Sequence, residues 1–243
     1  MRIDTVRTRP ELAAVVARGF AQFAQLNECE SSFLAEQATN FQRFSARSEL
    51  FDEDANGANP LFLLSGWACR ARSLADGRRQ ILDFILPGDL VGYCRPGGRT
   101  LAASYALTAV TVAPATRFYQ AAFDESGPFS HFADVCKAVE RRQELRLLNQ
   151  IVRAGRQTAY ERLAHLFLEF RERLERVGLA NHESFAMPLT QEMLADGLGL
   201  SVVHVNRTLQ QLRRERLVTV SDGVVTLLEP GALSQIADYR PMI

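Results

Sequence analysis

Residues 189–218 constrain the fold of this chain most strongly, because they combine two short helical segments with a glycine between them. The side-chain oxygen of Thr190 can cap the backbone donors of a helix over residues 191–197. Gly199 then supplies the left-handed backbone conformation that a sharp helix-to-helix turn needs, and Ser201 can cap the second helix. The segment therefore predicts a helix-turn-helix.

The second helical segment separates its residues into two faces. Val205, Leu209 and Leu212 recur at spacings of four and three, which places them on one inward face. The side chains expected to point outward or to lie along the rim are Val202, Val203, His204, Asn206, Arg207, Gln210 and Arg213. A short helix with such an outward face suits the major groove of DNA.

The size and composition of the chain bound its class. Its 243 residues are enough for two modest domains, and a hydrophobic content of 47% is typical of a globular protein. No apolar run approaches the roughly 18 residues of a membrane-spanning helix, and the N-terminus has no signal-peptide apolar region. We therefore expect a cytoplasmic protein without a membrane partner. The formal net charge is zero, so any binding to nucleic acid must come from a local patch.

The cysteines and histidines form no metal-binding pattern. Cys29, Cys69, Cys94 and Cys136 include no C-x-x-C pair, and the four histidines are scattered. A cytoplasmic setting also argues against structural disulfides. We interpret the cysteines as small buried hydrophobic residues and expect neither a metal nor a cofactor.

The first half of the chain changes from a helical to a β-strand pattern near residue 41. Residues 12–26 have helical apolar spacing, and a second helix is expected to begin at Ser31 and Ser32. Over residues 41–119, short β-prone runs alternate with glycine-rich turn signals. Many short strands without intervening long helices predict an antiparallel barrel or jelly roll.

Residues 128–153 return to a helical pattern with two apolar stripes. The first stripe comprises Phe132, Val135, Cys136 and Val139, and the second comprises Leu145, Leu148, Ile151 and Val152. A helix of this length is longer than a small domain needs to cover itself, so we expect it to pack against the same helix of a second subunit. The alternative is a helix packed only within its own subunit.

The remaining residues complete a second domain. Gly155 indicates a break in the long helix, and Thr158 with Glu161 fits the capping box of the next one. After the helix-turn-helix, β-branched runs flank Asp222 and Gly223, which predicts a two-stranded hairpin, or wing. The chain is thus predicted to be an α+β protein with three parts, which are N-terminal helices and a β-barrel (residues 1–127), a dimerisation helix (128–154) and a winged helix-turn-helix domain (155–243).

This order of parts resembles the cyclic AMP receptor protein and fumarate-nitrate regulator (Crp/Fnr) family of bacterial transcription regulators. The resemblance extends over about residues 41–228 and is most specific in the helix-turn-helix. The positions that match the family pattern there are Leu189, Thr190, Gly199, Ser201, Val205, Arg207, Leu209, Leu212, Leu217 and Val218. The motifs PGDLVG (87–92) and GRQTAYERLAHLFLEF (155–170) match as well.

The resemblance implies a homodimer that is not an enzyme. Its paired second helices would enter successive major grooves of double-stranded DNA on a palindromic site, and the protein would contact RNA polymerase. A barrel-type enzyme would instead need histidine and carboxylate ligands in the strands, and residues 41–119 contain no histidine.

The departures from the family pattern concern the base-contacting positions. Family members often carry Arg-Glu at the start of the second helix and an Arg four residues after the Glu, where this chain has Val202, Val203 and Arg207. Arg207 can bond guanine in a bidentate manner, whereas the valines can contact thymine methyl groups. We therefore expect a half-site unlike the family's best-known one. The candidate DNA-contacting residues are Thr190, Gln191, Ser201, Val202, Val203, His204, Asn206, Arg207 and Arg213.

The effector positions depart further. Cyclic-nucleotide binders of the family have a Glu for the ribose where this chain has Tyr93, and their Arg-Ser or Arg-Thr pair for the phosphate corresponds only out of register to Arg99 and Thr100. The oxygen-sensing branch holds an iron-sulfur cluster with several N-terminal cysteines, and only Cys29 lies there. We therefore expect control by neither cyclic AMP nor an iron-sulfur cluster.

An alternative remains open for the barrel. It would bind an unidentified small-molecule effector in a pocket around Tyr93, Arg99, Thr100 and Tyr105, or respond to oxidation of Cys94.

Overall fold

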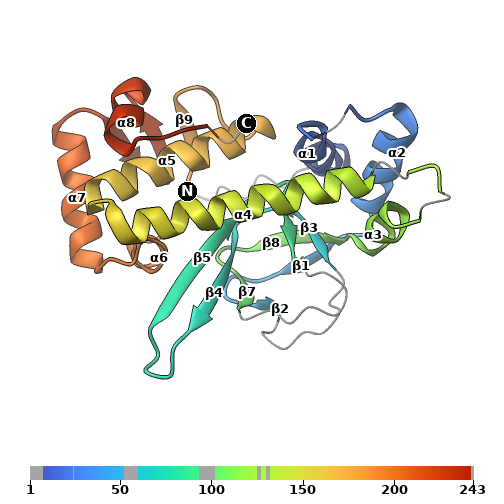
Figure 1. The fold of residues 1–243 in the computed structure, drawn as a ribbon, viewed down its shortest axis with the longest axis horizontal. Coiled ribbons are helices and arrows are strands. Elements are labelled where there is room, and N and C mark those ends of the chain that lie inside the picture. The colour runs from blue at the N-terminus through green and yellow to red at the C-terminus, as the bar shows by residue number, and fades with distance from the viewer. Residues whose placement is uncertain are drawn as a thin grey trace. The chain divides into compact units, whose positions relative to one another are not determined.

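The computed structural model describes residues 8–23, 25–51, 60–92, 102–124, 127–129 and 132–241. The chain divides into two compact units. The barrel unit comprises Met1–Arg72 and Phe84–Glu144, and the C-terminal unit comprises Ser73–Asp83 and Leu145–Ile243. One long helix, α4 (Phe132–Arg156), contributes residues to both (Figure 1).

The barrel unit is built on two four-stranded antiparallel sheets (Figure 1). The first has the strand order β1 (Gln42–Phe44), β8 (Val110–Pro114), β3 (Leu61–Ser65) and β6 (Leu90–Val91). The second has the order β2 (Glu49–Phe51), β7 (Ala103–Ala106), β4 (Ala68–Ser73) and β5 (Arg79–Ile85). Apolar side chains of both sheets share one core, formed by Leu63, Ala68, Ile85, Val91, Ala106, Val110 and Val112. The predicted antiparallel β architecture is confirmed.

The turns between these strands depend on unusual backbone conformations. Gly66, between β3 and β4, has a φ of +77°, and a Cβ atom there would lie 2.1 Å from the carbonyl oxygen of Ala109. Only glycine fits this position. Arg47 also has a positive φ, of 69°, in the turn that separates β1 from β2. The β-prone run at residues 41–51 therefore forms two strands, and they belong to different sheets.

Two N-terminal helices, α1 (Arg9–Ala21) and α2 (Glu28–Gln37), precede the strands. The ring centroid of Phe20 in α1 lies 5.5 Å from that of Phe62, which places α1 on the core of the barrel unit. The predicted start of the second helix at Ser31 and Ser32 is wrong. Asn27 caps α2, because its side chain accepts a hydrogen bond from the Glu30 amide at 2.9 Å and its own amide donates to the Glu30 carboxylate at 2.8 Å.

The segment after β8 also differs from the expectation. Residues up to 119 were expected to be β-prone, but Thr116–Ala122 form the short helix α3, which buries Phe118 completely. Farther along, α4 buries Phe132, Val135 and Cys136 in the same core, as the first apolar stripe predicts. The expected break at Gly155 does not interrupt this helix, which ends at Arg156.

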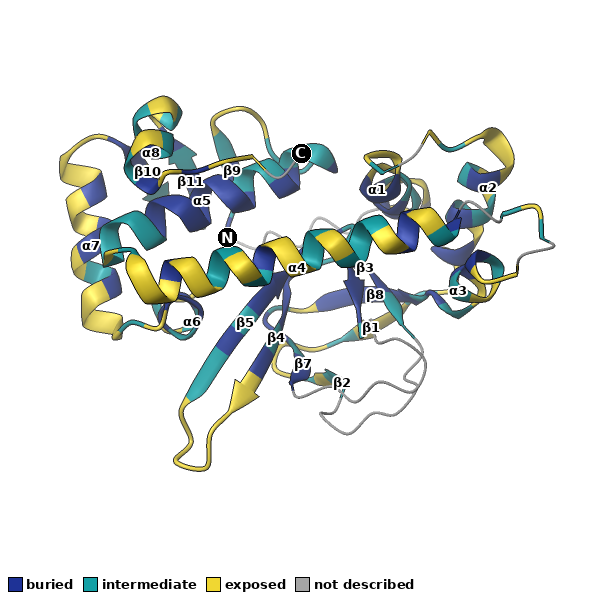
Figure 2. Ribbon diagram, in the orientation of Figure 1, coloured by how far each residue is buried: buried dark blue, intermediate teal, exposed yellow. Residues whose placement is uncertain are grey.

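The C-terminal unit surrounds α5 (Ala159–Arg176), which is almost entirely buried in its middle (Figure 2). The predicted capping box is present, since the Thr158 amide donates to the Glu161 carboxylate at 2.7 Å. The other elements are β9 (Ser184–Ala186), α6 (Gln191–Leu198), α7 (Val202–Arg214), β10 (Val218–Ser221), β11 (Val224–Leu227) and α8 (Pro230–Ala237). The strands pair in the order β10, β11, β9.

The predicted wing is confirmed as the hairpin of β10 and β11. Asp222 and Gly223 both have positive φ, of 51° and 75°, as a tight two-residue hairpin turn requires. Strand β9 and helix α8 were not predicted. Among the described residues, no helix is long and apolar enough to cross a membrane.

Candidate nucleic-acid interface

The helix-turn-helix is formed by α6 and α7. Gly199 ends α6 in the left-handed conformation, with φ 64° and ψ 39°. The Thr190 hydroxyl accepts a hydrogen bond from the Met193 amide, and the Ser201 hydroxyl accepts one from the His204 amide, both at 3.2 Å. The predicted turn and both predicted caps are therefore confirmed.

Helix α7 has one buried and one exposed face (Figure 2). Val205, Leu209 and Leu212 are buried, as their spacing predicts. On the opposite face Val203 is 78% exposed and Val202 is 44% exposed. The outward side of α7 therefore begins with apolar methyl groups in water.

Polar and basic side chains continue this exposed face. His204 and Arg207 are exposed, and within the described part of the chain neither side chain has a hydrogen-bond partner. Asn206 is half-buried and is bonded on two sides, by Gln191 from α6 at 3.1 Å and by Gln210 from α7 at 2.9 Å. The structure thus brings the two candidate residues Gln191 and Asn206 into contact. It adds Gln210, which was not among the candidate DNA-contacting residues, as a third bonded residue.

Arg213 is placed differently from the other candidates. Its guanidinium donates a hydrogen bond to the carbonyl oxygen of Val220 in β10. This contact joins the end of α7 to the wing. A contact of Arg213 with DNA stays a prediction.

The turn end of α6 is held by side chains from three other elements of the C-terminal unit. The last carbonyl groups of a helix have no partner within it. Here Gln80 of β5 donates to the carbonyl of Asp196 at 2.8 Å, and Gln150 of α4 donates to that of Gly197 at 2.6 Å. Arg162 of α5 donates to the carbonyl of Leu198 at 2.9 Å. We call these three donors, Gln80, Gln150 and Arg162, the turn clamp.

Two arginines make further contacts at the turn end of α6. Arg79, next to Gln80, forms an ion pair with the Asp196 carboxylate at 2.6 Å. Arg162 also donates to the carbonyl groups of Gln157 and Ala154, each at 2.8 Å. One guanidinium thus binds the ends of α4 and α6 and the segment between α4 and α5.

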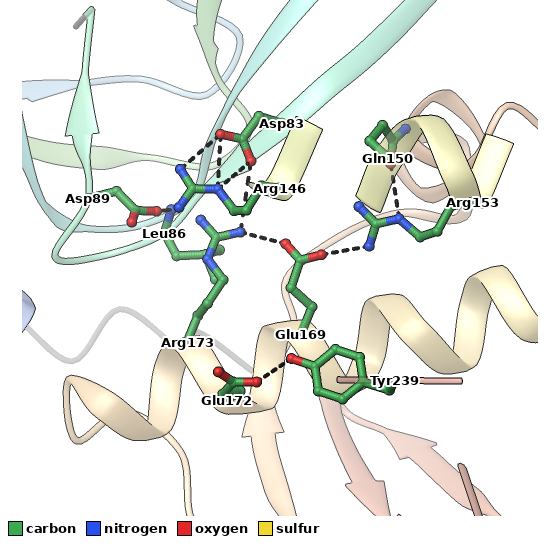
Figure 3. Close-up of polar contacts among 10 residues, drawn as sticks. All are labelled: Asp83, Leu86, Asp89, Arg146, Gln150, Arg153, Glu169, Glu172, Arg173 and Tyr239. Carbon is green, nitrogen blue, oxygen red and sulfur yellow. Dashed lines mark hydrogen bonds and ion pairs between the residues drawn. The ribbon is translucent and has the colours of Figure 1, made fainter. Parts of the chain in front are cut away.

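A buried charge network joins β5, α4 and α5 within the C-terminal unit (Figure 3). Asp83 pairs with Arg146 at 3.0 Å, and Glu169 pairs with Arg153 at 2.6 Å and with Arg173 at 3.0 Å. Burial opposes the charged form of Glu169, but the adjacent guanidiniums of Arg153 and Arg173 outweigh it and lower the pKa of Glu169 to about 2. The carboxylate is therefore charged, as a pair of buried arginines requires.

One residue connects this network with the helix-turn-helix. The side-chain oxygen of Gln150 accepts a hydrogen bond from Arg153 at 3.1 Å (Figure 3). Its side-chain nitrogen donates to the Gly197 carbonyl. Glu169, Arg153 and Gln150 therefore form a continuous polar chain that reaches the turn. No sequence pattern indicated this chain, because its members lie on two helices, α4 and α5, and it ends at the carbonyl of a third, α6.

The candidate effector residues are mostly outside the described residues. Tyr93, Arg99 and Thr100 fall there, as does Cys94. Tyr105 is half-buried in β7. The predicted pocket stays a prediction.

The described cysteines only partly match their interpretation as buried residues. Cys69 and Cys136 are buried, and burial together with the Glu140 carboxylate raises the pKa of the Cys136 thiol to about 12. Cys29 is exposed, contrary to the expectation, because it lies in the first turn of α2 on the side away from the core. The described residues contain no cluster of three potential metal ligands.

Comparison with known proteins identifies relatives of this chain. Residues 161–236 match the Crp-like helix-turn-helix domain. The chain is 30% identical over 227 residues to the transcriptional activatory protein AadR of Rhodopseudomonas palustris, covering 90% of each protein. It is 32% identical over 206 residues to the nitrogen fixation regulation protein FixK of Bradyrhizobium diazoefficiens, covering 80% of each.

Comparison with solved structures finds a relative of the same kind. The solved structure of FixK2 from Bradyrhizobium japonicum matches with a TM-score of 0.71 and 25% identity, over 83% of this chain and 98% of that one. These relatives are transcription regulators and not enzymes. With an identity of 30% over nine tenths of its length and a DNA-binding helix-turn-helix in the expected place, this chain belongs to the Crp/Fnr family of bacterial transcription regulators.

Proposed function

We propose that this chain acts as a cytoplasmic homodimer that binds a palindromic double-stranded DNA site through α7 of each subunit and contacts RNA polymerase through its exposed surfaces. The observation that carries the DNA site is the exposed face of α7. It presents two valines, Asn206 and Arg207 on the helix that follows α6, whose C-terminal end the turn clamp holds. Arg207 would bond guanine, and Val202 and Val203 would contact thymine methyl groups.

The dimer is proposed from the second apolar stripe of α4. Leu145, Leu148, Ile151 and Val152 are all exposed, with Ile151 the most exposed at 66%. They lie opposite the buried Arg146 and Arg153, which point into the C-terminal unit. A second copy of the same helix would cover this stripe and place two α7 helices on successive major grooves.

The direct test is a selection of bound sequences from a random double-stranded DNA pool with the purified full-length chain. We expect enrichment of an inverted repeat whose half-sites are about one helical turn apart, and binding that weakens steeply as salt rises. Enrichment of a single unrepeated site would contradict a symmetric dimer. No enrichment at any salt concentration would contradict sequence-specific binding.

We also propose that neither cyclic AMP nor an iron-sulfur cluster controls this regulator. Tyr93 offers no carboxylate for a ribose, Arg99 and Thr100 are out of register, and Cys29 is the one cysteine near the N-terminus. A thermal melt with and without millimolar cyclic AMP tests the first part, because a bound ligand raises the melting temperature. An upward shift would contradict the proposal.

A further inference from the structure

We infer that the side-chain amide of Asn206 recognises an adenine in the major groove, and that Gln191 and Gln210 hold it in the required orientation. The inference rests on the proposed function, because it needs α7 to lie in the groove. Its basis is a row of three linked amides on the DNA-facing side of the helix-turn-helix.

The row crosses from one helix to the other. Gln191 is the first residue of α6, and Gln210 lies four residues after Asn206 on α7. The Asn206 side-chain nitrogen donates to the Gln191 side-chain oxygen at 3.1 Å. The Gln210 side-chain nitrogen donates to the Asn206 side-chain oxygen at 2.9 Å. Asn206 is half-buried between these partners, whereas Gln210 is exposed.

The two bonds determine which hydrogen-bond donor and acceptor of the Asn206 side chain remain for a contact with DNA. A carboxamide has two N–H donors and an oxygen with two acceptor positions. Asn206 uses one donor toward Gln191 and one acceptor position toward Gln210. One donor and one acceptor remain on the same planar group. If all three amides were reversed together, the direction of donation would reverse, but the same pair would remain.

Adenine matches this remaining pair in the major groove. Its edge presents the N7 acceptor beside the N6 amino donor, so one carboxamide can bond both. Guanine presents two acceptors, cytosine one donor, and thymine one acceptor and a methyl group. Asn206 therefore discriminates for adenine, whereas the adjacent Arg207, which carries donors only, suits guanine.

The two glutamines act through Asn206. An unrestrained carboxamide can rotate out of the plane of the adenine edge, so that its remaining donor and acceptor no longer meet N7 and N6 together. Gln191 and Gln210 oppose this rotation from two sides before DNA binds. They also reduce the conformational entropy that Asn206 loses on binding. We therefore assign Gln191 and Gln210 as positioning residues.

Four substitutions separate the roles. Asn206→Ala removes the amide, and Asn206→Asp keeps its shape but loses both N–H donors. Gln191→Met and Gln210→Met keep the length of the side chain without its hydrogen bonds. Gln211→Met is the matched control, since Gln211 is also exposed on α7 but its amide donates to Glu215 at 3.0 Å.

Each variant is measured on the enriched site and on the three single-base variants at each position of the half-site, after a thermal melt has shown that it folds. We expect the wild type to prefer adenine at one position by about 5- to 150-fold. Asn206→Ala abolishes the preference at that position, and Asn206→Asp moves it toward cytosine, whose amino group a carboxylate can accept. Gln191→Met and Gln210→Met reduce the preference for adenine, and Gln211→Met leaves it unchanged.

Replacing that adenine by 7-deazaadenine tests the contact at a single atom. The analogue lacks the N7 acceptor, so it should weaken binding of the wild type and cause no further loss with Asn206→Ala. An equal loss with both proteins would overturn the contact.

If Asn206→Ala and Asn206→Asp keep the wild-type base preference at every position, the inference fails while the proposed function stands. If no sequence is enriched by the wild type, the proposed function itself fails. A full adenine preference in both glutamine variants would overturn the positioning role.

Discussion

Arg207 is exposed on α7 and has no partner among the described side chains, so its guanidinium is available to DNA. Arg207→Ala should lower the affinity for the enriched site by about 1 to 3 kcal/mol and relax the preference at one base position. Fluorescence anisotropy titrations at fixed salt measure both effects. Arg214→Ala is the comparison, because Arg214 is exposed in the last turn of α7, where we expect a phosphate contact, and the loss of such a contact weakens binding to all sequences alike. An unaltered base preference in Arg207→Ala would refute the assignment.

His165 makes the stability of the C-terminal unit sensitive to pH. It is buried in α5, and its ring packs edge-on against Tyr239 with the centroids 5.0 Å apart. Burial, helped by the nearby Arg153 guanidinium, lowers the pKa of His165 from 6.5 to about 4. A lowered pKa means that the folded state favours the neutral ring. The stabilisation is therefore complete above pH 6.5 and is lost as the pH falls through 4.

Acidification from pH 7 to pH 4 should thus reduce the free energy of unfolding by about 3 kcal/mol through His165 alone. Urea unfolding of the wild type and of His165→Phe over this pH range measures the contribution as the difference in their pH slopes. His182→Gln serves as the control, because the His182 side chain is 93% exposed. Parallel slopes for the wild type and His165→Phe would show that His165 does not titrate in this window. Glu169, with its pKa near 2, loses its stabilisation only at lower pH.

Among the elements, α6 depends on contacts from outside the helix-turn-helix. Arg162 of the turn clamp donates to three carbonyl groups, at 2.8, 2.8 and 2.9 Å. Arg162→Ala should destabilise the protein by roughly 2 kcal/mol, because helix-end carbonyls then lose a charged donor. Denaturant unfolding measures the change. Arg156→Ala, at an exposed position at the end of α4, should change stability by less than about 0.5 kcal/mol. An equally small effect of Arg162→Ala would contradict the importance of the clamp.

The elements also show what the sequence can predict. Thr190, Gly199 and Ser201 act on backbone groups within three residues, so their local signals predicted both helices of the motif. The start of α2 was misplaced because two adjacent serines resemble a cap, whereas the Asn27 and Glu30 pair forms the actual box. The three-residue strand β9 exists through its pairing with β11 and has no pattern of its own.

The hydrogen bonds of the turn clamp could not be predicted from the sequence, because they join residues that are far apart along the chain. Gln80, Gln150 and Arg162 bond carbonyl groups that are 116, 47 and 36 residues away along the chain. Amphipathic periodicity indicates which side of an element is buried, but not which polar side chain reaches a distant helix end. The same holds for the row of Gln191, Asn206 and Gln210. Two of its members were candidates singly, and only the structure shows that they are bonded.

At the scale of the whole molecule, the proposed dimer depends on the exposed stripe of α4. Leu148 is 50% exposed and Ile151 is 66% exposed, near the centre of that stripe. The double substitution Leu148→Glu with Ile151→Glu would place carboxylates in an apolar helix interface, at a cost of about 3 kcal/mol or more for an unpaired buried charge. Sedimentation velocity should then show a monomer at concentrations where the wild type is a dimer. Ala154→Glu adds a charge at an exposed position on the flank of the helix and is the control.

The same double variant links assembly to DNA binding. A monomer carries one α7, so it should bind a palindromic site and an isolated half-site with similar affinity, whereas the wild type should strongly prefer the palindrome. Because the substitutions are on α4, the base preference within each half-site should not change. A variant that is monomeric yet still prefers the palindrome would show that dimerisation arises elsewhere when DNA is bound. A variant that stays dimeric would show that the stripe is not the interface.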